Sequence, residues 1–174
     1  MDKLSKKVKI VMIFIVISLL GSGFYTWYIN ANQKHDEVHV HAGFKVFVDD
    51  KPVDFSLDKY MYFLPCGLDE HEQTTVQDRV HLHDGVGDVV HVHAKGVRWQ
   101  DLFESIKYKF PENVEIAYYI NGEKVEDLLS QEIVNEESII IVVDGKQAEQ
   151  EYFKEQVSVE RIEKIAHSKE NCGE

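Results

Sequence analysis

The stretch "RVHLHDGVGDVVHVHAKG", residues 79–96, reads almost the same from either end. It contains two His-x-His pairs, His81 with His83 and His91 with His93. In both arms the histidines alternate with valine or leucine, and a period of two is typical of a β-strand with one apolar and one polar face. The Asp-Gly and Gly-Asp steps between the arms favour a tight reversal. The stretch therefore predicts a β-hairpin with four imidazoles on one face.

A hairpin centred on Gly87 would pair His81 with His93 and His83 with His91. Directly opposed residues in such a pair have Cβ atoms about 4.5 to 5.5 Å apart. Imidazole nitrogens bind zinc at about 2.0 to 2.1 Å, which side chains from such positions can reach. The two cross-strand pairs are therefore predicted metal ligands.

A third His-x-His pair lies in "VHVHAGFKVFVDD", residues 38–50. This segment alternates in the same way and predicts a strand with one buried face. If it lies beside the hairpin, six imidazoles share one face of the sheet. The predicted metal ligands are then His81, His83, His91, His93, His39 and His41. Imidazole suits both zinc and copper, and the absence of a thiolate argues against selective copper(I) binding, so the choice between zinc and copper stays open.

After the palindrome the period changes. Apolar residues near helical spacing in "VRWQDLFESIKYKF", residues 97–110, predict one amphipathic helix of about ten residues that ends before Pro111. The next residues predict a strand to Ile120, a turn at Asn121-Gly122, a short return strand, and a buried strand at Ile139–Val143. The predicted fold class is α+β.

From Arg79 to Gly145, the order of hairpin, helix, strand, turn, short helix and strand resembles the β-grasp, or ubiquitin-like, fold. This resemblance implies a mixed sheet packed on one helix, with the strand at 38–48 added to it. It implies no particular activity, because such folds host many functions. The wider layout also resembles uncharacterised small membrane-anchored histidine-rich proteins of bacteria and archaea.

Residues 10–29, "IVMIFIVISLLGSGFYTWYI", contain no charged side chain. At about 1.5 Å per residue, a helix of this length spans about 30 Å, so the segment predicts a single transmembrane anchor. Lysines precede it, which predicts that the basic tail 1–9 is cytoplasmic and that the chain after Ile29 is extracytoplasmic. A cleaved signal peptide is the competing interpretation.

The predicted organisation places a stalk at 30–37, a histidine-rich domain at 38–145 and a polar, weakly helical tail at 146–174. The net charge of -12 argues against a nucleic-acid partner, because phosphate binding depends on clustered lysine and arginine. Cys66 and Cys172 form no C-x-x-C pair, which argues against a thiol oxidoreductase.

These observations predict a membrane-anchored, extracytoplasmic protein that captures, delivers or senses zinc or copper. One alternative is a tethered β-grasp interaction module that binds a protein at a sheet edge and responds to pH through its histidines. A second alternative is a small metal-dependent enzyme, since three histidines with an open position can activate water. We favour a non-enzymatic role, because no residue outside the histidine set is arranged as a base or nucleophile.

Overall fold

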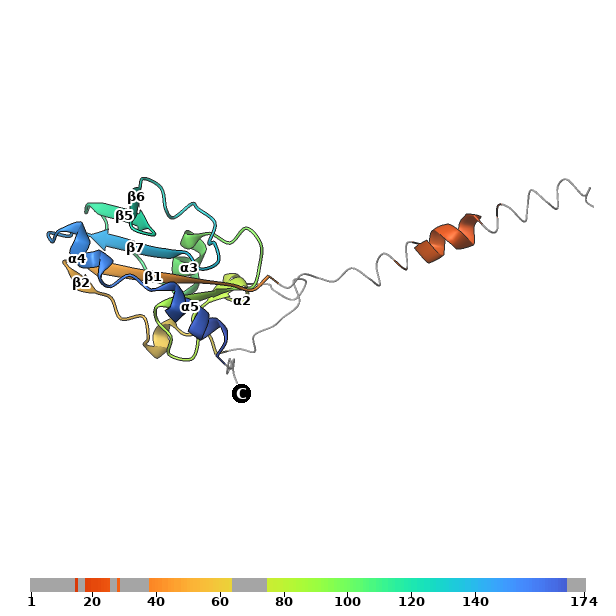
Figure 1. Cartoon of the computed structure of the whole chain (residues 1–174), viewed down its shortest axis with the longest axis horizontal. Coiled ribbons are helices and arrows are strands. Elements are labelled where there is room, and N and C mark those ends of the chain that lie inside the picture. The colour runs from red at the N-terminus through yellow and green to blue at the C-terminus, as the bar shows by residue number, and fades with distance from the viewer. Residues whose placement is uncertain (1–14, 16–17, 26–27, 29–37, 64–74, 169–174) are drawn as a thin grey trace, which may run out of the picture. The chain divides into compact units, whose positions relative to one another are not determined.

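The computed structural model describes residues 15, 18–25, 28, 38–63 and 75–168 (Figure 1). Contacts divide the chain into two compact units, residues 1–36 and 37–174, and each is described by itself. The predicted basic tail and stalk lie outside the described residues, as do Cys66 and Cys172.

The prediction of a transmembrane anchor at Ile10–Ile29 must be corrected. Among the described residues, no helix combines the length and the apolar character needed to cross a membrane. The predictions of a single-pass membrane location, a membrane partner and an extracytoplasmic domain all depended on this anchor, and they are corrected with it.

The second unit is α+β and is built on one mixed sheet of seven strands. The strand order is β3-β4-β1-β7-β5-β6, and β2 pairs with β1. β1 runs parallel to β7, and all other pairs are antiparallel. The strands are β1 (Val40–Val48), β2 (Lys51–Pro52), β3 (Val80–His81), β4 (Val89–Val92), β5 (Ile116–Ile120), β6 (Glu123–Val125) and β7 (Ser138–Val143). The strand at 38–48 thus lies beside the hairpin, as the six-histidine face requires.

The main core lies between one face of the sheet and α3 (Trp99–Ser105), close to the α2 helix (Val76–Arg79) and the short η1 helix (Asp58–Tyr60). α3 begins after Arg98, whose backbone amide donates to the Asp101 carboxylate at 2.8 Å. Phe44 of β1 is fully buried beside the fully buried Trp99. The even-numbered residues of β1 therefore face this core, which leaves its histidine on the opposite face.

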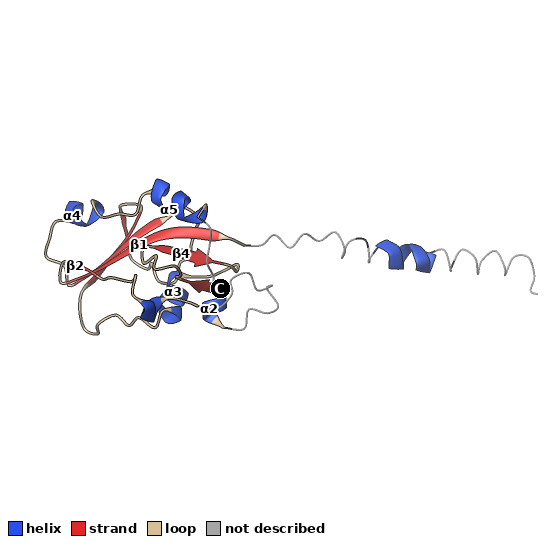
Figure 2. Cartoon of the chain, turned by 90° about the horizontal axis from the view of Figure 1, so that it is seen from below, coloured by secondary structure: helices blue, strands red, loops and turns tan. Residues whose placement is uncertain are grey.

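That opposite face is also covered. α4 (Glu149–Phe153) and α5 (Val159–Ala166) lie on one side of the sheet, and α2 and α3 lie on the other (Figure 2). Tyr152, Val157 and Ile162 are buried in this second layer. The predictions of one packed helix and of one buried face for the strand at 38–48 are therefore wrong. The reason is that α4 and α5 are short. Each has only a few apolar residues in a polar segment, which is a weak signal for a helix packed on a sheet.

The second layer depends on a close approach at Gly43 of β1. A Cβ atom placed on Gly43 would lie 2.6 Å from Cβ of Val157, which leaves no room for a side chain. Arg161 of α5 also forms an ion pair with Asp88 at 3.0 Å. Ser158 begins the helix by accepting a hydrogen bond from the Arg161 amide at 3.3 Å.

Gly43→Ala is expected to lower the free energy of unfolding by about 2 kcal/mol, because an added methyl group in a packed core forces backbone or side-chain shifts. Chemical denaturation of the full chain measures this change. Gly21→Ala is the matched control, since an added Cβ there meets no atom within 4 Å. Equal stability of the two variants would contradict the close packing of the segment before α5.

Candidate metal centre

Three neighbouring strands carry the histidines, and the strand register aligns one from each. His81 of β3 pairs with His91 of β4, and His91 pairs in turn with His41 of β1. The loop before β7 holds the backbone of His41. The His41 amide donates to Asn135 Oδ1 at 3.0 Å, and the His41 carbonyl accepts from the Glu136 amide at 2.8 Å. A row of three imidazoles therefore crosses the sheet.

The hairpin register differs from the prediction. His81 opposes His91 and not His93, so the centre is Val86 and not Gly87. The reversal uses Asp84 and Gly85, which have positive φ angles of 55° and 69°. A shift of the partner by two residues preserves the side-chain face, because strand side chains alternate with a period of two. The predicted pairs are wrong, but all four palindrome histidines keep their common face.

Gly87 has a role other than the turn. A Cβ atom on this residue would lie 2.3 Å from the backbone nitrogen of Ser56 and 2.5 Å from the carbonyl carbon of Phe55. Glycine is required at 87 because the segment at 55–56 passes against the hairpin. Nothing in the local sequence of the palindrome signals that contact.

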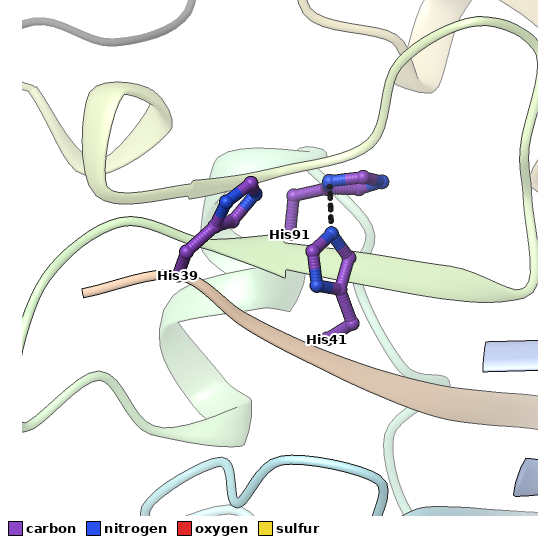
Figure 3. A group of neighbouring side chains, drawn as sticks. All are labelled: His39, His41 and His91. Atoms are coloured by element: carbon purple, nitrogen blue, oxygen red, sulfur yellow. Dashed lines mark hydrogen bonds between the residues drawn. The ribbon is translucent and has the colours of Figure 1, made fainter. Parts of the chain in front are cut away.

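His39, His41 and His91 form a group that could hold a metal ion, which we call the first histidine cluster (Figure 3). Their candidate ligand atoms all lie within 4.8 Å of one another. His41 Nε2 and His91 Nδ1 are 3.0 Å apart, joined by a hydrogen bond. Two nitrogens bound to one tetrahedral zinc ion are separated by about 3.4 Å, so small side-chain movements would close the site. His41 and His91 are buried and His39 is exposed, which leaves one open side.

The other predicted ligands, His81, His83 and His93, lie directly beside these three, and we call them the second histidine cluster. Their ring centroids are separated by 5.7 Å for His81 and His83 and by 5.0 Å for His81 and His93. The His83 ring lies 3.8 Å from that of His91, and the His93 ring lies 5.0 Å from that of His39. All six predicted ligands therefore belong to one continuous group of imidazoles.

Hydrogen bonds orient two rings of the second cluster. His81 Nδ1 lies 2.7 Å from the carbonyl oxygen of Gln77. His83 Nδ1 lies 2.9 Å from a carboxylate oxygen of Asp84. Both oxygens only accept, so each Nδ1 donates its proton, and in a neutral ring the lone pair then lies on Nε2. This arrangement is typical of metal-ligating histidines, whose second nitrogen is held by a carbonyl or carboxylate.

Burial sets the charge state of His81. His41, His81, His83 and His91 are between 0 and 4% exposed. Burial lowers the pKa of His81 to about 3, and the neighbouring His93, His91 and His83 lower it further, against the opposing effect of the Gln77 hydrogen bond. His81 is therefore neutral at physiological pH, which is the form that binds metals. The expected solvent-facing platform is therefore wrong for these four residues, which lie in the interior.

Two residues near His81 carry no signal in the sequence. The Tyr62 ring stacks on the His81 ring with centroids 4.8 Å apart. The Tyr62 hydroxyl donates to the Asp78 carboxylate, which also accepts from the amide of Thr75 at 2.7 Å. Burial, together with Asp78, raises the pKa of Tyr62 to about 12 and keeps its hydroxyl protonated. Tyr62 lies before a non-periodic segment, so its contact with β3 is a tertiary effect.

A comparison of the chain with family models, curated proteins and solved structures finds no match. The resemblance to the β-grasp fold and to small anchored histidine-rich proteins therefore stays a prediction. The geometry of the described residues is what bears on function. His39, His41 and His91 form a cluster with the spacing of a metal site.

Proposed function

We propose that this protein binds a transition metal, zinc or copper, through its histidine face, and that it serves in capture, delivery or sensing of that ion. The observation that carries the proposal is the spacing of His39, His41 and His91, whose ligand atoms lie within 4.8 Å of one another. Three imidazoles at this separation supply the donors that borderline divalent metals prefer.

The energetics of burial support this proposal. Polar groups removed from water cost free energy unless they are hydrogen-bonded, and the core on the other face of the sheet is filled by apolar residues. Imidazoles in the second layer stabilise the fold less well than valine or leucine would at the same positions. A bound ion would offset that cost by taking the place of water at the ring nitrogens.

The arrangement also supports reversible loading. His41 and His91 are buried, whereas His39 lies at the exposed start of β1. An ion could reach the buried nitrogens past His39 without opening the sheet. Among the described residues, none of the carboxylates beside the first cluster is arranged as a general base, so capture or delivery fits the geometry better than catalysis does.

Titration of the full chain with zinc and with copper(II), followed by calorimetry, tests the proposal. His39→Ala is expected to weaken the affinity at least tenfold and to leave the fold intact, because His39 is exposed. His41→Ala with His91→Ala is expected to weaken it a hundredfold or more. His167→Ala is the matched control, since His167 is exposed at the end of α5 and should not affect affinity. Affinity unchanged in all three variants would reject the site.

A further inference from the structure

The first cluster accounts for only half of the histidine face. We propose that the second cluster, His81, His83 and His93, binds a second metal ion beside the first, so that the full chain holds two. This inference rests on the proposed function, because it takes the histidine face to be a metal site. It adds the stoichiometry and the ligands of the second ion.

The first argument is orientation. The Nδ1 atoms of His81 and His83 donate to Gln77 and Asp84, which fixes the two rings and leaves each Nε2 as the acceptor. In metal sites, a histidine that binds the metal through one ring nitrogen donates a hydrogen bond from the other to a carbonyl or carboxylate oxygen. His81 and His83 have this kind of partner.

The second argument is an unsatisfied atom. Nε2 of His83 is buried and has no hydrogen-bond partner among the described residues. His83 is 3% exposed, so bulk water does not reach the ring. Buried polar atoms are almost always paired, and an exception calls for a ligand or an ion that completes it. A metal ion at this nitrogen would satisfy it.

The third argument is ring spacing. An imidazole bound at about 2.1 Å places its centroid about 3.2 Å from the ion, so two rings on one tetrahedral ion have centroids about 5 Å apart. The observed separations are 5.7 Å for His81 with His83 and 5.0 Å for His81 with His93. The separation of His81 and His93 matches shared ligation, and His83 must rotate toward them, because among the described residues only the first cluster already has the spacing of a metal site.

Ligand number also favours two ions. Zinc in proteins is almost always bound by four ligands, so one ion would leave at least two of the six imidazoles without metal. Two neighbouring ions can use all six.

Native mass spectrometry of the full chain loaded with zinc gives the test, with two ions expected per chain. Asp84→Asn is the sharpest variant, because asparagine keeps the size and tolerates the positive φ of residue 84 but removes the charge that holds His83. It is expected to weaken the second site ten- to a hundredfold and to leave the first unchanged. His83→Ala should leave one ion, and His39→Ala should weaken the other site.

Copper(II) provides an independent readout. Two copper(II) ions in neighbouring clusters should broaden each other's electron paramagnetic resonance lines, and His83→Ala should restore the narrow spectrum of a single ion. One ion per chain that His83→Ala and Asp84→Asn both leave unchanged would overturn the second site while the proposed function stands. A chain that binds no metal would overturn both.

Discussion

Saturation with zinc is expected to raise the free energy of unfolding of the full chain by about 4 kcal/mol for each bound ion when free zinc exceeds the dissociation constant a thousandfold. The folded chain aligns His81, His91 and His41 across three strands. The unfolded chain offers only separate His-x-His pairs, which bind metal more weakly. Zinc therefore raises the free energy of unfolding by RT ln(1 + c/Kd), where c is the free zinc concentration and Kd is the dissociation constant of the folded chain.

Denaturant titration with and without zinc measures this shift, and a chelator should reverse it. The His41→Ala and His91→Ala double variant should show a lower stability without metal and a smaller stabilisation by zinc, because only the second histidine cluster remains to bind it. His167→Ala, which changes an exposed histidine just after α5, should behave as the wild type does. A zinc effect of the same size in the double variant would place the ion elsewhere on the chain.

Acid is expected to destabilise the metal-free protein by about 3 kcal/mol between pH 7 and pH 4.5, through His81 alone. Burial lowers the pKa of this residue to about 3 in the folded chain, and its ordinary value is 6.5. Between these two values the unfolded chain binds a proton that the folded chain does not. Stability is therefore fully present above pH 6.5 and is lost as the pH falls toward 3.

The groups that face His81 are the rings of His83, His91, His93 and Tyr62, with Asp78 behind Tyr62. Denaturation of the chelated chain at several pH values measures the slope. His81→Gln should flatten it, because glutamine does not titrate, and His167→Gln should leave it unchanged. An identical slope in wild type and His81→Gln would show that His81 does not govern the loss.

Much of the local structure could be predicted from the sequence, because it follows from short-range patterns. The strands at 116–120, 123–125 and 138–143 agree with the alternation, the Asn121-Gly122 turn and the apolar run. The helix at 99–105 is confirmed but is shorter than predicted. The predicted alternation of side chains along each strand is also confirmed. The six histidines therefore lie on one face, even though the predicted hairpin register was wrong.

The transmembrane helix shows the opposite case. Twenty uncharged residues at 10–29 satisfied the composition of a membrane span, and composition was the only basis for the prediction. The described residues contain no helix that is both long and apolar enough to cross a membrane. Hydropathy reports how well a helix would suit a bilayer, and it does not show that the helix forms.

The sequence by itself determined which residue types alternate along each strand, and hence that the imidazoles of three strands share a face. Only the tertiary structure decided that this face is buried and that His81, His91 and His41 stand in one row. The physical reason is range. Side-chain alternation is a property of neighbouring residues, whereas register and burial depend on contacts between residues far apart in the sequence, such as Gly87 with Ser56 and Gly43 with Val157.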